Sequence, residues 1–87
     1  MTRKHKQFLL GRKIAEQARE CVDWLKVNKF EVLLVLKGSF HARIIIKPSS
    51  LCMLLDGVVD AYERTPRGGR RYNYVSRYDC MVEWEAA

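Results

Sequence analysis

The strongest hydrophobic pattern in the chain lies in residues 30–48, where two runs of mostly valine, leucine and isoleucine flank Gly38-Ser39. Such side chains favour a pleated strand, and a Gly-Ser pair between two runs is typical of a two-residue turn with glycine at positive φ. The pattern therefore predicts a β-hairpin. A turn at Gly38-Ser39 places Lys37 opposite Phe40 and sets the register of both strands.

This register gives the hairpin two unequal faces. One face is wholly apolar and is expected to contact the core: Leu33, Val35, Phe40, Ala42, Ile44 and Ile46. The other face combines the basic residues His41 and Arg43 with Val32, Leu34, Leu36 and Ile45. Because a sheet with one face in water usually alternates more regularly, we expect another element or a second chain to cover this face. Its apolar residues are the predicted dimer or partner face.

A helical pattern precedes the hairpin. Apolar residues recur at steps of three and four positions and form one stripe: Leu10, Ile14, Ala18, Cys21 or Val22, and Leu25. This spacing predicts an amphipathic helix from Gln7 to Lys26 or Val27, with Asn28 as its stop. Residues 1–6 are expected to form a basic tail before the helix.

A second helix is the preferred interpretation of residues 51–64. Ser49-Ser50 supplies an N-cap, and one helical face would be apolar: Leu51, Leu54, Leu55, Val58, Val59 and Tyr62. Gly57 disagrees with this interpretation, because glycine inside a helix costs about 1 kcal/mol relative to alanine. The alternative is a hairpin that turns at Asp56-Gly57.

The C-terminal part of the chain alternates with period two. Residues 64–70, which contain a proline and two glycines, are expected to form a flexible basic loop. Beyond the loop, one parity is apolar or aromatic: Tyr72, Tyr74, Tyr78, Cys80, Val82 and Trp84. Residues 70–85 therefore form either one bent strand or two strands with a turn near Ser76–Asp79.

The element order is thus α-β-β-α-β, with a further strand if residues 70–85 divide. We predict a single α+β domain over residues 1–87, with an antiparallel sheet of three or four strands and two helices on one face. The chain is 48% hydrophobic and 30% charged, which is typical of a globular protein. No apolar run approaches the ~20 residues of a membrane span, and we expect a cytoplasmic protein.

Positive charge is concentrated in two segments of the chain. There are 16 lysine and arginine residues against 10 acidic residues, which gives a net charge of +6. Residues 1–13 carry five basic and no acidic side chains, and residues 64–78 carry five arginines and no acidic residue. Concentrated positive charge favours polyanions or acidic protein surfaces as partners.

The sequence carries no motif for catalysis, nucleotide binding or metal binding. Cys21, Cys52 and Cys80 are too far apart for a zinc motif and are expected to be buried thiols. His41 is expected to be an exposed strand residue, because nothing in the sequence fixes a catalytic partner beside it. We therefore expect a non-enzymatic protein without a cofactor or a metal.

The segment 64–78 interleaves arginines, glycines and tyrosines. Arginine binds phosphate through a fork of donors, glycine allows close backbone approach, and tyrosine rings stack on bases. The predicted binding residues are Arg64, Arg67, Arg70, Arg71, Arg77, Tyr72 and Tyr74, assisted by Lys4, Lys6 and Arg12. The alternative is that the tyrosines belong to the core and the arginines to a solvated rim.

These patterns predict a small regulatory or accessory protein whose basic surface engages nucleic acid or a nucleoprotein complex. The alternative is a protein-directed inhibitor or adaptor, of the kind that a phage or other mobile element uses against a host machine. It would act through the apolar face of the hairpin or through the basic loop. A homodimer through the apolar face is a third expectation.

Overall fold

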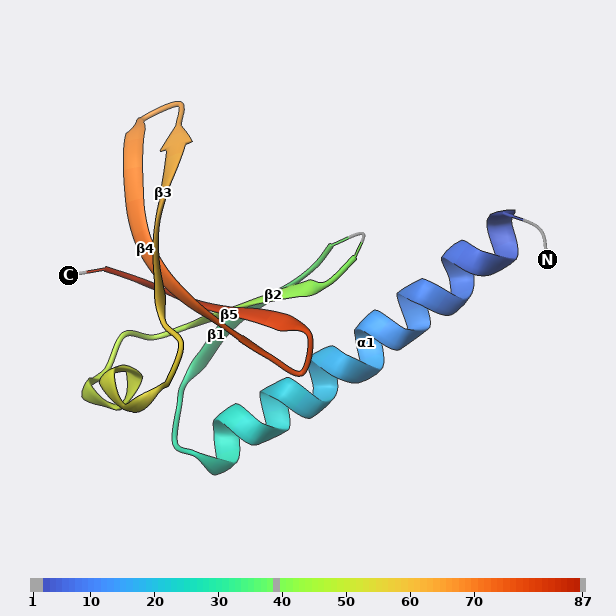
Figure 1. Cartoon of the computed structure of the whole chain (residues 1–87), viewed down its shortest axis with the longest axis horizontal. Coiled ribbons are helices and arrows are strands. Elements are labelled where there is room, and N and C mark those ends of the chain that lie inside the picture. Colours follow the sequence, from blue (N-terminus) through green and yellow to red (C-terminus); the bar gives the residue numbers. More distant parts are fainter. Residues whose placement is uncertain (1–2, 39, 87) are drawn as a thin grey trace.

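The computed structural model describes residues 3–38 and 40–86, with the backbone alone for residues 3–12. Within these residues the chain forms one long helix, a short 3-10 helix and a five-stranded sheet (Figure 1). In chain order the elements are α1 (Arg3–Val27), β1 (Val32–Lys37), β2 (Ala42–Ile46), η1 (Ser50–Leu54), β3 (Val59–Thr65), β4 (Gly68–Arg77) and β5 (Cys80–Glu85).

The strands lie in the order β1-β2-β5-β4-β3. The last strand, β5, is central, since it pairs antiparallel with β4 and parallel with β2. The β1–β2 hairpin and the β3-β4-β5 meander are therefore joined along one parallel seam. The predicted antiparallel sheet of three or four strands is wrong, because local periodicity identifies strands but not their distant neighbours.

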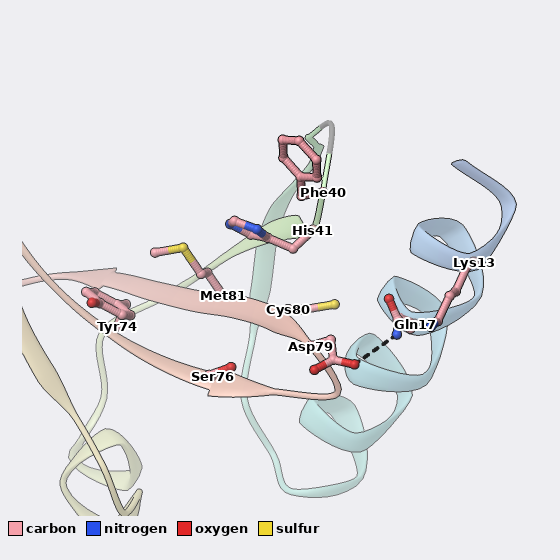
Figure 2. Close-up of a pocket in the computed structure, with 9 residues that line it drawn as sticks. All are labelled: Lys13, Gln17, Phe40, His41, Tyr74, Ser76, Asp79, Cys80 and Met81. Atoms are coloured by element: carbon pink, nitrogen blue, oxygen red, sulfur yellow. Dashed lines mark hydrogen bonds between the residues drawn. The ribbon is translucent and has the colours of Figure 1, made fainter. Parts of the chain in front are cut away.

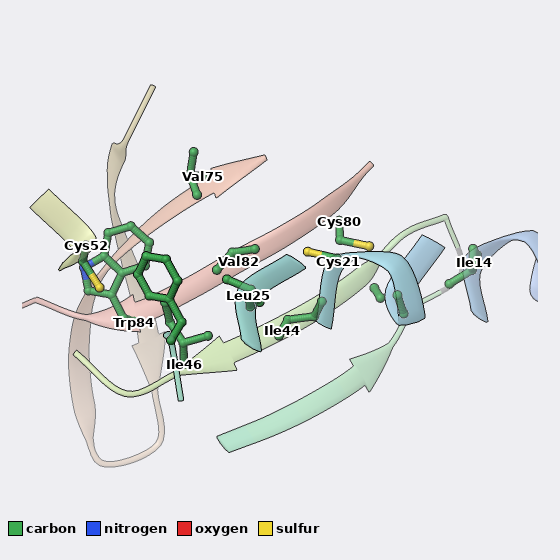
Figure 3. Packing of buried hydrophobic residues seen from close by; sticks show 13 residues of the cluster. Ile14, Cys21, Leu25, Ile44, Ile46, Cys52, Val75, Cys80, Val82 and Trp84 are labelled. Carbon is green, nitrogen blue, oxygen red and sulfur yellow. The ribbon is translucent and has the colours of Figure 1, made fainter. Parts of the chain in front are cut away.

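The helix α1 covers one face of the sheet, over β1, β2 and β5. The predicted stripe is buried at Ile14, Ala18, Cys21 and Leu25, while the side chain of Leu10 lies outside the described residues. Figure 3 shows how these residues pack against the sheet, where the buried residues are Ala42, Ile44, Ile46, Val75, Cys80, Val82 and Trp84. Burial of each large apolar side chain stabilises the fold by about 1.5–3 kcal/mol.

The prediction that α1 ends at Val27 is confirmed, but its predicted start is wrong. The helix begins at Arg3, so residues 3–6 are helical rather than a tail. Met1 and Thr2 lie outside the described residues. In the part of the chain that the structure covers, no helix combines the length and apolar composition that a membrane span needs.

The predicted second helix is wrong. Ser50–Leu54 forms only a 3-10 helix, whose N-cap Ser49 makes no side-chain hydrogen bond to a backbone amide, and β3 follows at Val59. Gly57 has φ of +78°, which turns the chain into β3. The alternative of a hairpin between strands Leu51–Leu55 and Val58–Arg64 is right for the turn and the second strand, but the first segment is a 3-10 helix. The predicted helical stripe does not form one buried face: Leu51 and Leu55 pack against the core, whereas Leu54 is 77% exposed and Tyr62 is 61% exposed.

Residues 70–85 form two strands that turn at Tyr78-Asp79. Both turn residues have positive φ, 51° for Tyr78 and 58° for Asp79. The register pairs Arg77 with Cys80, so the tight turn reverses the parity of inward residues between β4 and β5. Even-numbered residues of β5 face the core, whereas those of β4 face away from α1.

The hairpin of residues 30–48 is present, but its predicted register is wrong. Lys37 pairs with Ala42 rather than Phe40, which is 79% exposed, and the Gly38 amide donates to the His41 carbonyl at 3.1 Å. Glycine is required at position 38 for close approach, since a Cβ there would lie 2.6 Å from that oxygen. The predicted turn residue Ser39 lies outside the described residues.

The shift by two residues preserves parity in most of the hairpin, so Ala42, Ile44 and Ile46 face α1 as expected. An irregularity between Val32 and Leu34 changes the faces at the start of β1. Val32 consequently packs against the core instead of joining the predicted partner face, and Leu33, expected in the core, is 56% exposed.

Candidate binding surfaces

The β3–β4 hairpin projects beyond the part of the sheet that α1 covers (Figure 1). Its strands pair from Val59 with Tyr74 to Thr65 with Gly68, whereas β5 reaches only as far as Tyr72 on β4. Residues 68–71 of β4 therefore pair with β3 alone. The predicted flexible loop of residues 64–70 is the tip of this hairpin, with a turn at Pro66-Arg67.

Two local features shape the hairpin tip. The hydroxyl of Thr65 donates to the Gly68 carbonyl at 3.1 Å, and Gly68 has φ of +123°. The Tyr62 ring lies directly against Gly69, where a Cβ would collide with it. Glycine at position 69 thus allows an exposed tyrosine to lie across the neighbouring strand.

Strand pairing sorts the arginines of the hairpin onto different faces. Arg64 pairs with Gly69 and Arg71 pairs with Tyr62, which places Arg64, Arg71 and Tyr62 on the α1 side of the sheet. Arg67 lies in the turn between the strands. Within the described part of the chain, Arg64, Arg67 and Arg71 are exposed, and their side chains make no hydrogen bond or ion pair. We call these three residues the arginine tip.

Arg70 lies on the opposite, open face of the sheet and is held by carboxylates. Its Nη2 is 3.4 Å from Glu83 Oε1 and 3.8 Å from Glu63 Oε2. Arg43 contacts the same two acids, with Nη2 2.9 Å from Glu83 Oε1 and 3.7 Å from Glu63 Oε2. The hydrogen bonds that Arg43 donates to the Glu83 carboxylate raise the pKa of Arg43 above its ordinary value. These two arginines are therefore neutralised within the protein.

Tyr72 and Tyr74 also lie on the open face, so the alternative that placed them in the core is wrong. Their ring centroids are 6.3 Å apart, and both side chains are half-buried. The Arg70 guanidinium carbon lies 4.7 Å from the centre of the Tyr72 ring, which is a cation–π contact. Arg70 thus already occupies one face of Tyr72.

The remaining predicted contacts do not join the arginine tip. Arg77 donates to the carbonyls of Asp56 at 2.9 Å and Ser76 at 2.8 Å, and so holds the Asp56-Gly57 turn. The side chains of Lys4, Lys6 and Arg12 lie outside the described residues. The backbone that carries them is at the far end of α1 from the hairpin tip (Figure 1). The two basic segments are therefore separate.

The predicted partner face is only partly exposed. Leu34 and Leu36, which pair with Ile45 and Arg43, lie on the open face and are 49% and 39% exposed. Ile45 is half-buried on the same face. In the described residues no helix lies over this face. The face is therefore either exposed to solvent or covered by something outside this part of the chain.

A cavity of about 460 Å³ lies between α1, the β1–β2 turn and the β4–β5 turn (Figure 2). Gln17 donates to Asp79 across it at 3.1 Å. The His41 imidazole lines this cavity without a hydrogen-bond partner among the described residues, so no acid–base pair is formed there. The described residues also hold no cluster of three or more His, Cys, Asp or Glu suited to a metal.

The three cysteines are buried free thiols. Burial is the main cause that raises the pKa of Cys21 to about 12, and burial also raises the pKa of Cys80. A thiol with a raised pKa is protonated at neutral pH and is a poor nucleophile. The geometry therefore supports surface binding rather than thiol chemistry.

Comparisons with protein-family models, with curated proteins and with solved structures find no match for this chain. Sequence reasoning missed the carboxylates that hold Arg43 and Arg70, and it missed Tyr62 beside the arginine tip. Glu83 interrupts an otherwise apolar run in β5, which is a local signal of a buried charge. Its partner Arg43 is 40 residues away, so that signal could not identify the pair.

Proposed function

We propose that the protein binds nucleic acid through the arginine tip of the β3–β4 hairpin, without catalysing a reaction. One observation carries this proposal: Arg64, Arg67 and Arg71 lie together on a projecting hairpin and have no internal partner in the described residues. Unpaired guanidinium groups on a protruding element are available to phosphates. Arg70 and Arg77 instead hold other parts of the protein together.

The shape of the hairpin fits a nucleic-acid groove. A two-stranded ribbon is narrow enough to enter the major groove, which is about 12 Å wide. Phosphate contacts from the arginine tip would set position without reading sequence. Tyr62 adds an exposed ring on the same face, and base stacking on such a ring contributes about 1–3 kcal/mol for single strands.

The test measures binding to labelled single- and double-stranded 20-mers at several salt concentrations. The double variant Arg64→Gln with Arg71→Gln removes two phosphate contacts, so duplex affinity should fall and the slope of log K against log salt should flatten by about 2. The double variant Lys26→Gln with Lys29→Gln removes the same charge at the end of α1 and serves as the control. Equal losses in both variants would show a general charge effect and contradict the assignment.

A second candidate is a protein-directed inhibitor or adaptor, and it is favoured by the apolar surface around η1. Met53 is 86% exposed and Leu54 is 77% exposed. Both lie near a groove of about 670 Å³ that includes Met53, Val58 and Trp84. The test is whether a protein partner stays bound after nuclease treatment. Loss of that partner with Met53→Glu, but not with Arg64→Gln, would support this candidate over nucleic-acid binding.

A further inference from the structure

The strand β1 is an edge of the sheet with an unusually apolar surface. It pairs with β2 on one side, and no described strand lies on its other side. Four consecutive large apolar residues are exposed: Leu33 at 56%, Leu34 at 49%, Val35 at 39% and Leu36 at 39%. The free backbone edge of β1 is therefore open to an additional strand, and so is the face of β1 that lies away from α1.

The opposite edge of the same sheet is protected. The strand β3 contains the charged residues Asp60, Glu63 and Arg64. Such charges discourage pairing with another chain, as edge strands of monomeric proteins usually require. The strand β1 has no charge before Lys37 and contains no proline. The contrast shows that the unprotected edge is specific to β1 and is not a general property of this sheet.

We propose that β1 pairs antiparallel with β1 of a second copy of this chain. The charges at the two ends of the strand select this occupant and this direction. Glu31 precedes β1 and is 65% exposed, with its Oε2 3.8 Å from Lys47 Nζ, and Lys37 ends the strand. An ion pair as exposed as Glu31–Lys47 is weak, so Glu31 can exchange Lys47 for Lys37 of the second copy. An antiparallel pair brings Lys37 of each copy towards Glu31 of the other, whereas a parallel pair would bring like charges together. The strand is thus complementary in charge to itself.

Antiparallel pairing of identical strands requires a two-fold axis perpendicular to the sheet. The two sheets then continue into one, with both α1 helices on the same face and both open faces on the other. The strands then cross at Leu34, so Leu34 of each copy is brought beside its counterpart on the open face. Because β3 is at the opposite edge from β1, the two β3–β4 hairpins lie at the outer ends of the assembly.

The test combines solution mass with charge reversal. Sedimentation over a range of concentrations should show a monomer–dimer equilibrium for the natural chain. Glu31→Lys and Lys37→Glu should each weaken dimerisation about fivefold or more, because each places like charges at both ends of the pair. Mixing the two variants should restore dimerisation, since every contact in the mixed dimer is again between opposite charges. Asp60→Lys on the far edge is the matched control and should change nothing.

Leu34→Lys provides an independent variant, because it buries a lysine against its counterpart on the open face. It should lower the dimer affinity at least about tenfold, the equivalent of 1.4 kcal/mol, while circular dichroism shows an unchanged fold. Monomers at every concentration would overturn the proposal. The proposal would also be overturned if a mixture of the Glu31→Lys and Lys37→Glu proteins formed dimers without a preference for the mixed dimer.

Discussion

Arg43 and Glu83 form a two-pronged ion pair across the parallel seam between β2 and β5. Arg43 Nη2 lies 2.9 Å from Glu83 Oε1, and Arg43 Nε donates to Glu83 Oε2. The Glu83 side chain is 1% exposed, although no helix in residues 3–38 and 40–86 covers this face of the sheet. Arg43 and Arg70 therefore do on the open face what α1 does on the other: they shield the central strand from water.

This relationship predicts a large effect from removing one partner. Arg43→Leu leaves the Glu83 carboxylate buried with only the longer contact to Arg70, and should lower the free energy of unfolding by about 3 kcal/mol. The double variant Arg43→Leu with Glu83→Leu replaces both charges by apolar groups and should recover most of the loss. Urea unfolding measures both values, and a double variant less stable than Arg43→Leu would contradict this role.

A second prediction distinguishes the observed turn at Gly57 from the helix that the sequence favoured. Gly57→Ala should lower stability by about 1 kcal/mol, because φ of +78° is unfavourable for a residue with a Cβ. Nothing lies within 4 Å of the position that the new Cβ would take, so only the backbone effect is measured. In a helix the same change would increase stability by about 1 kcal/mol.

The control for this experiment is Gly57→Asn. Asparagine tolerates positive φ better than alanine, so this variant should be closer in stability to the natural chain. Urea unfolding of the three proteins gives the order directly. If the Gly57→Ala variant were the most stable of the three proteins, residues 51–64 would be helical after all.

The sequence predicted those elements whose partners are close in the chain. The stripe of Ile14, Ala18 and Leu25 has one helical interpretation, and the hairpin of residues 30–48 follows from two adjacent runs. The prediction for residues 51–62 was wrong because their apolar spacing fits a helix as well as it fits a turn and a strand. The positive φ of Gly57 decides against the helix. The positions of apolar residues alone do not reveal positive φ.

The candidate site was predicted less well than the fold, and for a different reason. Five arginines near one another in sequence alternate between faces when they lie on paired strands, so Arg70 is separated from Arg71. A turn at Tyr78-Asp79 then reverses the parity that had suggested a buried Tyr72. Which arginines are unpaired depends on carboxylates from other strands, and local patterns cannot supply those.

A third prediction concerns the buried thiol of Cys21. Its pKa in the native protein is raised to about 12, whereas an unfolded cysteine ionises near pH ~8.5. Above that pH the unfolded chain loses the proton and the native chain keeps it, so stability falls as pH rises, by about 1.4 kcal/mol per pH unit. This contribution is complete below pH ~8.5 and ends near pH ~12.

Cys21→Ala removes this titration. The stability difference between the natural chain and the variant should therefore shrink by about 2–3 kcal/mol between pH 8.5 and pH 10.5. Urea unfolding under reducing conditions at several pH values measures the difference, and the comparison cancels the titration of lysines and tyrosines. A difference that stays constant across this range would contradict the raised pKa.

The last prediction joins the two proposed surfaces and depends on both. If β1 pairs with its copy, nine strand spacings separate the two β3 strands, so the hairpins are about 40 Å apart in a flat sheet. A duplex of about 30 base pairs spans this distance, whereas one of about 10 base pairs does not. The natural chain should bind the longer duplex at least about tenfold more tightly than its extra sites explain, because the second contact is intramolecular.

Leu34→Lys should lose this advantage and keep its affinity for the short duplex, since its arginine tip is intact. The double variant Arg64→Gln with Arg71→Gln should keep the mass of the dimer. If it loses binding to the short duplex, the hairpin is the part of the protein that contacts the duplex. Equal length dependence in the natural chain and in Leu34→Lys would instead show that each hairpin binds alone.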